Sequence, residues 1–182
     1  MDQGAESYRR FLAGDETGLT EIVAQFADGL ILFALPIVGD AAAAEDIAEE
    51  TFARLCIKKP AYKDTASFKT WLYTIARRLA LDHVKKHGRA QPVPEETLAE
   101  LPDMADTPEE AVVRREEQAA VRRALNTLKP EYAEVLTLTY IEGLSNRQTA
   151  KVMRKSVHAV ENLNSRARAA LKKALQAEGV DG

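Results

Sequence analysis

Basic and aromatic side chains are concentrated in one stretch of this chain, SFKTWLYTIARRLALDHVKKHGR at residues 67–89. The stretch carries six Lys or Arg residues against one Asp, and Phe68, Trp71 and Tyr73 lie close together near its start. A row of cations can hold the phosphates of a nucleic acid, and aromatic faces can stack on unpaired bases. These residue types at this spacing therefore indicate binding of a polyanion.

The charge of the whole chain is segregated along the sequence. The net charge of −3 combines acidic segments with basic ones: residues 1–50 hold eleven acids and two bases, and residues 144–175 hold eight bases and one acid. One basic helix would be read as an ordinary solvated face. Two separated basic segments favour a polyanion that is contacted at two places.

Catalytic chemistry has few candidates in this composition. The chain contains three His and one Cys, and it shows no Gly-rich phosphate loop, no Ser-His-Asp ordering and no metal-ligand spacing. His83 and His87 would share a helix face, but no third ligand is evident, and a polar pair facing a groove is the preferred interpretation. Cys56 excludes an internal disulfide and is predicted to be a buried core thiol. We expect no enzymatic activity, no cofactor and no metal.

The elements that position these residues are predicted to be helices throughout. Nine Gly and seven Pro leave little room for a turn-rich β fold, and residues with high helix propensity dominate. Cap-forming side chains precede the expected helices, at Asp15, at Asp40, and at Thr65 or Ser67 before the basic stretch. The buried side of that basic helix is expected to consist of four apolar residues: Leu72, Ile75, Leu79 and Val84.

The second half of the chain shows the same kind of pattern after an acidic, proline-containing segment. Thr107 and Pro108 predict a helix start, and Pro130 starts a helix that stops at Gly143. The sequence thus predicts an all-α fold of two small helical domains of about equal size, at residues 1–90 and 107–178. A flexible acidic linker at 91–106 would join them, and a short tail would follow at 179–182.

A helix-turn-helix pattern lies in the second domain. Ser145 and Gln148 predict a capped short helix, "RKS" a turn, and Ser156 the cap of a longer basic helix. Polar side chains near the front of such a helix can read base edges in the major groove. The candidate DNA contacts are Lys155, Ser156, His158, Glu161, Asn162, Ser165, Arg166 and Arg168. A plain helical hairpin with a polar exterior is the alternative.

Four blocks of the chain resemble, in order, the bacterial RNA polymerase sigma factors of the extracytoplasmic-function (ECF) type, in the sigma-70 family. "AGDETGLTEIV" is similar to the opening helix of sigma region 2, and "AEDIAEETFARL" to the part of region 2 that grips polymerase. Residues 67–89 resemble the helix that melts the promoter and reads the -10 element. "LNTLKPEYAEVLTLTYIEGLSNRQTAKVM" with "SVHAVENLNSRARAAL" resembles region 4, which reads the -35 element.

The resemblance implies a role for the basic and aromatic residues of the first domain. A sigma factor holds one promoter strand after the duplex opens, and Tyr62 matches a family position where an aromatic commonly lies beside a flipped base. Stacking contributes on the order of 1–3 kcal/mol per base. The implied contacts with the -10 element and the single strand are Tyr62, Lys63, Arg77, Arg78, Lys85, Lys86 and Arg89. By the family pattern Trp71 is a core residue.

The resemblance also implies protein partners. The acidic block Asp46, Glu49 and Glu50 with Phe52 is similar to the family's surface for the clamp of the large subunit of core RNA polymerase. An acidic rim around an apolar anchor suits a basic helical partner. The family is usually held inactive by an anti-sigma factor, so such a partner is expected.

Some positions depart from the family pattern. Arg78 stands where Asn is frequent, Glu49 where Gln is common, and Arg154 where the turn usually has Gly. Arg154 therefore implies modest backbone strain or a different turn. Glu161 replaces a position that is often basic; it could accept from a cytosine amino group or pair with a neighbouring base such as Lys155.

The function that follows is that of a sigma factor, which binds core polymerase, recognises -10 and -35 elements and promotes strand opening. The linker would let the two domains engage sites separated along DNA and fold together when idle. The alternative is a stand-alone helix-turn-helix regulator that binds duplex DNA. The first residues precede no apolar run, and the run from Leu30 to Val38 is too short to span a membrane and is expected to break at Pro36. We therefore expect a cytoplasmic protein without a membrane segment.

Overall fold

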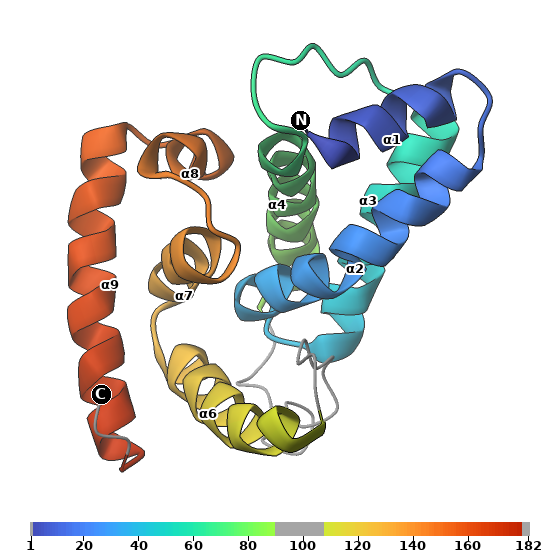
Figure 1. Cartoon of the computed structure of the whole chain (residues 1–182). Helices are drawn as coiled ribbons and strands as arrows, with labels where there is room; N and C mark the ends of the chain where they lie inside the picture. Colours follow the sequence, from blue (N-terminus) through green and yellow to red (C-terminus); the bar gives the residue numbers. More distant parts are fainter. Residues whose placement is uncertain (1, 90–107, 180–182) are drawn as a thin grey trace.

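The computed structural model describes residues 2–89 and 108–179, which form helices joined by turns and loops, with no strand in that part of the chain. Figure 1 shows the helices in chain order. They are α1 (Gln3–Leu12), α2 (Thr17–Val38), α3 (Ala41–Lys58), α4 (Phe68–His87), α6 (Pro108–Thr127), α7 (Pro130–Leu136), the π-helical turn η1 (Thr137–Ile141), α8 (Asn146–Met153) and α9 (Val157–Ala177). The predicted all-α fold is confirmed.

Local capping explains where several helices begin. The Asp40 carboxylate accepts from the N–H of Ala43, and the Ser67 hydroxyl accepts from the N–H of Thr70, so both predicted caps are formed. Ser156 caps α9 in the same way. Ser145 begins α8 with the complete capping box that the sequence predicted. These caps satisfy N–H groups that have no partner inside a helix.

Helix α2 is the centre of the first half and packs against α1, α3 and α4. It continues through Pro36 to Val38, so the predicted break at Pro36 is wrong. By length and composition α2 could cross a membrane, but half of its most apolar window is buried inside the fold. Its apolar residues, including Leu30 and Phe33, belong to the hydrophobic core.

The predicted helix from Pro130 to Gly143 consists of α7 and one π-helical turn. In this stretch the hydroxyl groups of Thr137 and Thr139 donate hydrogen bonds to the backbone carbonyls four residues earlier. The turn ends at Ile141, and Gly143 two residues later has a φ of +70°, a conformation that glycine adopts without steric cost. A π turn changes the angular spacing of side chains relative to an α-helix, and its last two residues, Tyr140 and Ile141, lie exposed.

The two halves of the chain pack against each other. Figure 1 shows α7 and α8 lying between α9 on one side and α4 and α2 on the other, and contacts join α4 to α8 and α2 to α7. The predicted linker at 91–106, the predicted cap Thr107 and residues 180–182 of the predicted tail lie outside the described residues.

Candidate nucleic-acid interface

The cations predicted to contact the promoter, on α4 and just after it, fall into two groups according to the direction they face. Arg78, Lys85, Lys86 and Arg89 are exposed, whereas Arg77 is turned toward the second half of the chain. Arg89 also donates from Nε to the Pro36 carbonyl at the end of α2. The predicted phosphate contacts therefore do not form one continuous surface in this arrangement.

Arg77 forms an ion pair with Glu134 of α7, across the boundary between the two halves. The Arg77 side chain is 13% exposed and the Glu134 side chain 5%. Burial raises the pKa of Glu134 above its ordinary value, and the attraction of Arg77 lowers it by less. Removing a carboxylate from water costs free energy, and the attraction of its partner offsets only part of that cost.

Lys69, near the start of α4, makes a second ion pair across the same boundary. Its Nζ lies 3.4 Å from Oε2 of Glu142 and 3.2 Å from the Glu142 carbonyl oxygen. The Glu142 carboxylate also lies against buried Tyr73, whose pKa is raised by burial and by that carboxylate. Gly29 of α2 leaves room for this group, because a Cβ there would collide with the Tyr73 hydroxyl and crowd Glu142.

Tyr62 lies in the loop between α3 and α4 and is partly exposed, as is Trp71, whereas Phe68 and Tyr73 are fully buried. The Tyr62 ring packs at 5.2 Å from the Trp71 ring and edge-on at 5.7 Å from Phe68. Two of the three aromatic residues near the start of this stretch, Phe68 and Tyr73, are thus core residues. Tyr62 and Trp71 present the aromatic surface that solvent reaches, and Lys63 beside them is exposed.

The acidic face of α3 carries Asp46, Glu49 and Glu50, all exposed as predicted. Phe52, predicted as the apolar anchor of that face, is only 9% exposed and belongs to the core. Ile57 is 79% exposed and is the apolar residue that α3 presents to solvent. The prediction that Cys56 is buried is also wrong, because its side chain is exposed.

An open groove of about 800 Å³ separates α3 from α4. Asp46 and Glu50 lie on its α3 wall, and Lys85 and Lys86 lie on its α4 wall. The structure thus brings part of the predicted polymerase surface close to part of the predicted promoter surface. The sequence treated these as separate sites, because nothing in the local pattern says that α3 and α4 are neighbours.

Helix α9 presents a polar face to solvent, as predicted. His158, Glu161, Asn162, Ser165, Arg166 and Arg168 are exposed, together with Lys155 and Ser156 at its start. The Asn162 amide lies 3.3 Å from His158 Nε2. Lys155 pairs with Glu131 of α7 at 2.7 Å, so the suggested pairing of Lys155 with Glu161 is not formed.

The turn before α9 is strained at the position that the sequence identified. Arg154 ends α8 with φ 55° and ψ 46°, the left-handed conformation that glycine adopts most easily. A non-glycine residue there costs roughly 1–2 kcal/mol. The departure from glycine is therefore accommodated by strain and not by a different turn.

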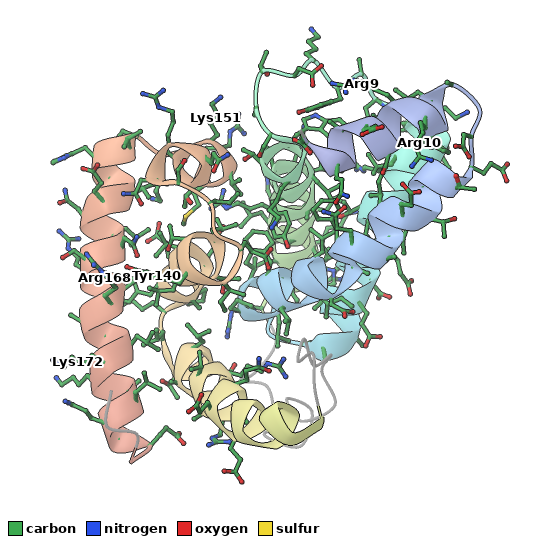
Figure 2. All side chains as sticks on the ribbon, viewed as in Figure 1. Arg9, Arg10, Tyr140, Lys151, Arg168 and Lys172 are labelled. Carbon is green, nitrogen blue, oxygen red and sulfur yellow. The ribbon has the colours of Figure 1, made fainter. Side chains whose placement is uncertain are left out.

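The sequence missed an apolar hollow of about 460 Å³ between α6, η1 and α9. Tyr140, Ile141 and Leu171 line it, and Arg168 and Lys172 border it. Figure 2 shows Tyr140 and Arg168 next to each other at this place. The exposure of Tyr140 depends on the register of the π turn, which the helical spacing of the sequence does not reveal.

Helix α1 was also missed, although its sequence carries a signal. Asp2 caps it, and Tyr8 and Phe11 are spaced three residues apart on its buried side. In the described part of the chain, no group of three His, Cys, Asp or Glu side chains could hold a metal ion. The rings of His83 and His87 lie 4.8 Å apart without a third ligand.

Comparisons with known proteins agree with this geometry. The sequence profile of Sigma-70 region 2 matches residues 22–90, and that of Sigma-70 region 4 matches residues 118–171. The RNA polymerase sigma-H factor of Pseudomonas aeruginosa is 30% identical over 97% of this chain and 95% of its own length. The ECF RNA polymerase sigma factor BldN of Streptomyces coelicolor is 31% identical over 89% of this chain, which spans 62% of BldN.

A solved structure shows the same fold. The sigma factor RpoE of Bartonella quintana, determined in complex with the anti-sigma factor NepR, superposes with a TM-score of 0.66 at 19% identity. The superposition covers 86% of this chain and 96% of that one. At this level of identity the likeness concerns the arrangement of the helices.

Proposed function

The chain belongs to the ECF group of the sigma-70 family of RNA polymerase sigma factors, and on that premise we propose which of its surfaces contact polymerase and promoter DNA. Proteins of this family are DNA-recognition subunits without a catalytic centre of their own. We assign promoter opening to residues 1–90, duplex recognition to residues 107–178, and a connecting role to residues 91–106. Such a protein acts in the cytoplasm, where core polymerase meets the chromosome.

The Tyr62 loop and α4 hold the opened -10 strand. Tyr62 and Trp71 offer partly exposed rings for unpaired bases, and Lys63 lies beside them. Capturing an extruded base offsets an unstacking cost of a few kcal/mol. The phosphate contacts come from cations of α4 and from Arg89 just after it; those of α4 are Arg77, Arg78, Lys85 and Lys86.

Helix α9 reads the -35 element in the major groove of duplex DNA. Its exposed side chains combine hydrogen-bonding groups for base edges, such as Asn162, with cations for phosphates, such as Arg166. The remaining contacts are Lys155, Ser156, His158, Glu161, Ser165 and Arg168.

The acidic face of α3 docks on the clamp of core polymerase. Asp46, Glu49 and Glu50 supply the charge that a basic helix requires, and Ile57 takes the place of Phe52 as the exposed apolar anchor. An anti-sigma factor that covered this face would keep the chain inactive.

Promoter engagement requires the two halves to separate. The -10 and -35 elements lie about 25 base pairs apart, or about 85 Å along B-form DNA. In the packed arrangement α4 and α9 are separated by two helix-packing spacings, about 20 Å in all. The 18 residues between Arg89 and Pro108 can span at most about 60 Å, enough to bridge most of the difference. Separation also frees Arg77 and Lys69 from Glu134 and Glu142.

The observation that carries this proposal is the occurrence of three matching surfaces on one chain: the acidic face of α3, the Tyr62 loop with α4, and α9. A stand-alone regulator would need only α9. A gel-shift experiment separates the two functions, using duplex fragments selected from a random promoter library. We expect tight, promoter-specific binding only when core polymerase is present. Equally tight binding by the chain alone would favour the regulator.

A further inference from the structure

We infer that α1 is a positioning element for strand capture, because it holds the loop that carries Tyr62 and Lys63 in a fixed shape. The inference rests on the proposed function of that loop. Helix α1 precedes residue 22, where the match to Sigma-70 region 2 begins, so that match assigns α1 no role.

Two side chains of α1 bind the loop at its start and at its middle. The Tyr8 hydroxyl donates to the carbonyl of Pro60 at 2.6 Å. Arg9 Nη2 lies 2.7 Å from Oδ1 of Asp64. Asp64 has φ 56°, a left-handed conformation that Asp tolerates better than most residues, and the ion pair holds it on the side of α1.

The cap of α1 binds the end of the same loop. One carboxylate oxygen of Asp2 accepts from the N–H of Ala5 and begins α1, at 3.2 Å. The other oxygen accepts from the N–H of Phe68, the first residue of α4, at 2.7 Å. A single side chain therefore fixes the N-terminus of α1 to the N-terminus of α4, where the loop ends.

Tyr8 also packs against the buried side of the aromatic surface that Tyr62 and Trp71 form. It is fully buried, and its ring lies 5.3 Å from that of Trp71 and 5.6 Å from that of Phe68. Tyr62 packs on these same two rings. The position of Tyr62 thus depends on α1 through ring packing as well as through the backbone of the loop.

Helix α8 also contacts the loop, through Lys151 and through Gln148, whose Nε2 lies 3.5 Å from the Ser67 hydroxyl, but these contacts belong to the packed arrangement. Lys151 donates to the carbonyl of Thr65 at 3.1 Å, and both α8 contacts are lost when the halves separate. The contacts from α1 lie entirely within the first half. Helix α1 therefore keeps the loop in shape at the stage when the promoter strand arrives.

The test compares two adjacent arginines of α1. Arg9 binds the loop, whereas Arg10 pairs with Asp15 and Glu21 on the α2 side (Figure 2). Holoenzymes carrying Tyr8→Phe, Arg9→Ala or Arg10→Ala are assayed with permanganate for strand opening on a selected promoter fragment. We expect opening about fivefold slower for Tyr8→Phe and about twofold slower for Arg9→Ala. Arg10→Ala should open at the wild-type rate, and all three should bind core polymerase normally.

Hydrogen exchange of the loop amides and a Tyr62→Ala holoenzyme separate the possible failures. Faster exchange at residues 61–67 in Tyr8→Phe and Arg9→Ala, but not in Arg10→Ala, supports the inference. Unchanged exchange would overturn it, as would normal opening by Tyr8→Phe and Arg9→Ala while Tyr62→Ala opens slowly. Normal opening by Tyr62→Ala would contradict the proposed function of the loop, while the exchange would still decide whether α1 holds it.

Discussion

Arg77 has two possible partners, a promoter phosphate and the buried carboxylate of Glu134. Both bind the guanidinium by charge-assisted hydrogen bonds. In the packed arrangement the carboxylate occupies it. Because burial outweighs the attraction of Arg77 and raises the pKa of Glu134, the pair is costly to keep away from water. Replacing this ion pair by a contact between Arg77 and a DNA phosphate therefore costs less free energy than exposing an apolar contact of the same size.

The pH dependence of stability tests this view of Glu134. A carboxyl whose pKa is raised by folding contributes stability that is fully present below its ordinary pKa of 4.5 and is lost as the pH rises through the folded value. Glu134→Gln cannot titrate. We therefore expect the two chains to be similarly stable near pH 4.5, with the free energy of unfolding of the wild type falling relative to Glu134→Gln as the pH rises. Urea unfolding over this range measures the difference. If the free energy of unfolding of the wild type instead rose relative to that of Glu134→Gln as the pH increased, the attraction of Arg77 would outweigh burial and lower the pKa of Glu134.

At the scale of helices, α3 shows that a sequence pattern predicts where a helix begins but does not predict which of its apolar residues face solvent. Its cap at Asp40 is a local feature and was predicted correctly. Which apolar side chain faces outward depends on how α3 packs against α2 and α4. Phe52 follows the stripe that contains Ile47 and Leu55, and it is buried with them, whereas Ile57 points to the opposite side. The periodicity contained that signal, but the family resemblance favoured Phe52.

The same distinction applies to the other helices. Caps at Ser67, Ser145 and Ser156 and the polar face of α9 depend on neighbours in sequence, and all were predicted. The pairing of Arg77 with Glu134 and the contacts of α1 with the Tyr62 loop join residues more than fifty positions apart. No local pattern encodes such contacts, so only the three-dimensional structure reveals them.

The exposed face of α3 gives a prediction at the same scale. Ile57→Ala truncates the most exposed large apolar side chain of this face, and we expect it to weaken binding to core polymerase about tenfold. Val23→Ala, which truncates an exposed apolar residue of α2, is the matched control and should bind normally. Competition with a labelled wild-type chain for core polymerase measures both. Normal binding by Ile57→Ala would exclude Ile57 as an anchor.

At the scale of the whole molecule, the proposed function implies that the packed arrangement and the promoter-bound arrangement exclude each other. The interface between the halves uses α2, α4 and the Tyr62 loop on one side and α7, η1 and α8 on the other. It therefore covers part of the surface proposed for the -10 strand. We propose that core polymerase and two separated DNA sites together supply the binding energy that opens this interface.

A reversible cross-link between the halves tests the central claim most directly. Thr65→Cys and Lys151→Cys place thiols on two residues that face each other across the interface, where Lys151 Nζ lies 3.1 Å from the Thr65 carbonyl oxygen. The single natural cysteine of the chain is replaced by Cys56→Ser. A reducible bismaleimide then locks the packed arrangement. Arg123→Cys with Glu178→Cys, which bridges α6 and α9 within the second half, is the matched control.

Run-off transcription with core polymerase gives the result. We predict that the chain cross-linked between residues 65 and 151 initiates no transcription, that reduction of the cross-link restores initiation, and that the control initiates in both states. Undiminished initiation by the locked chain would contradict the account, because the two halves would then not need to separate on the promoter.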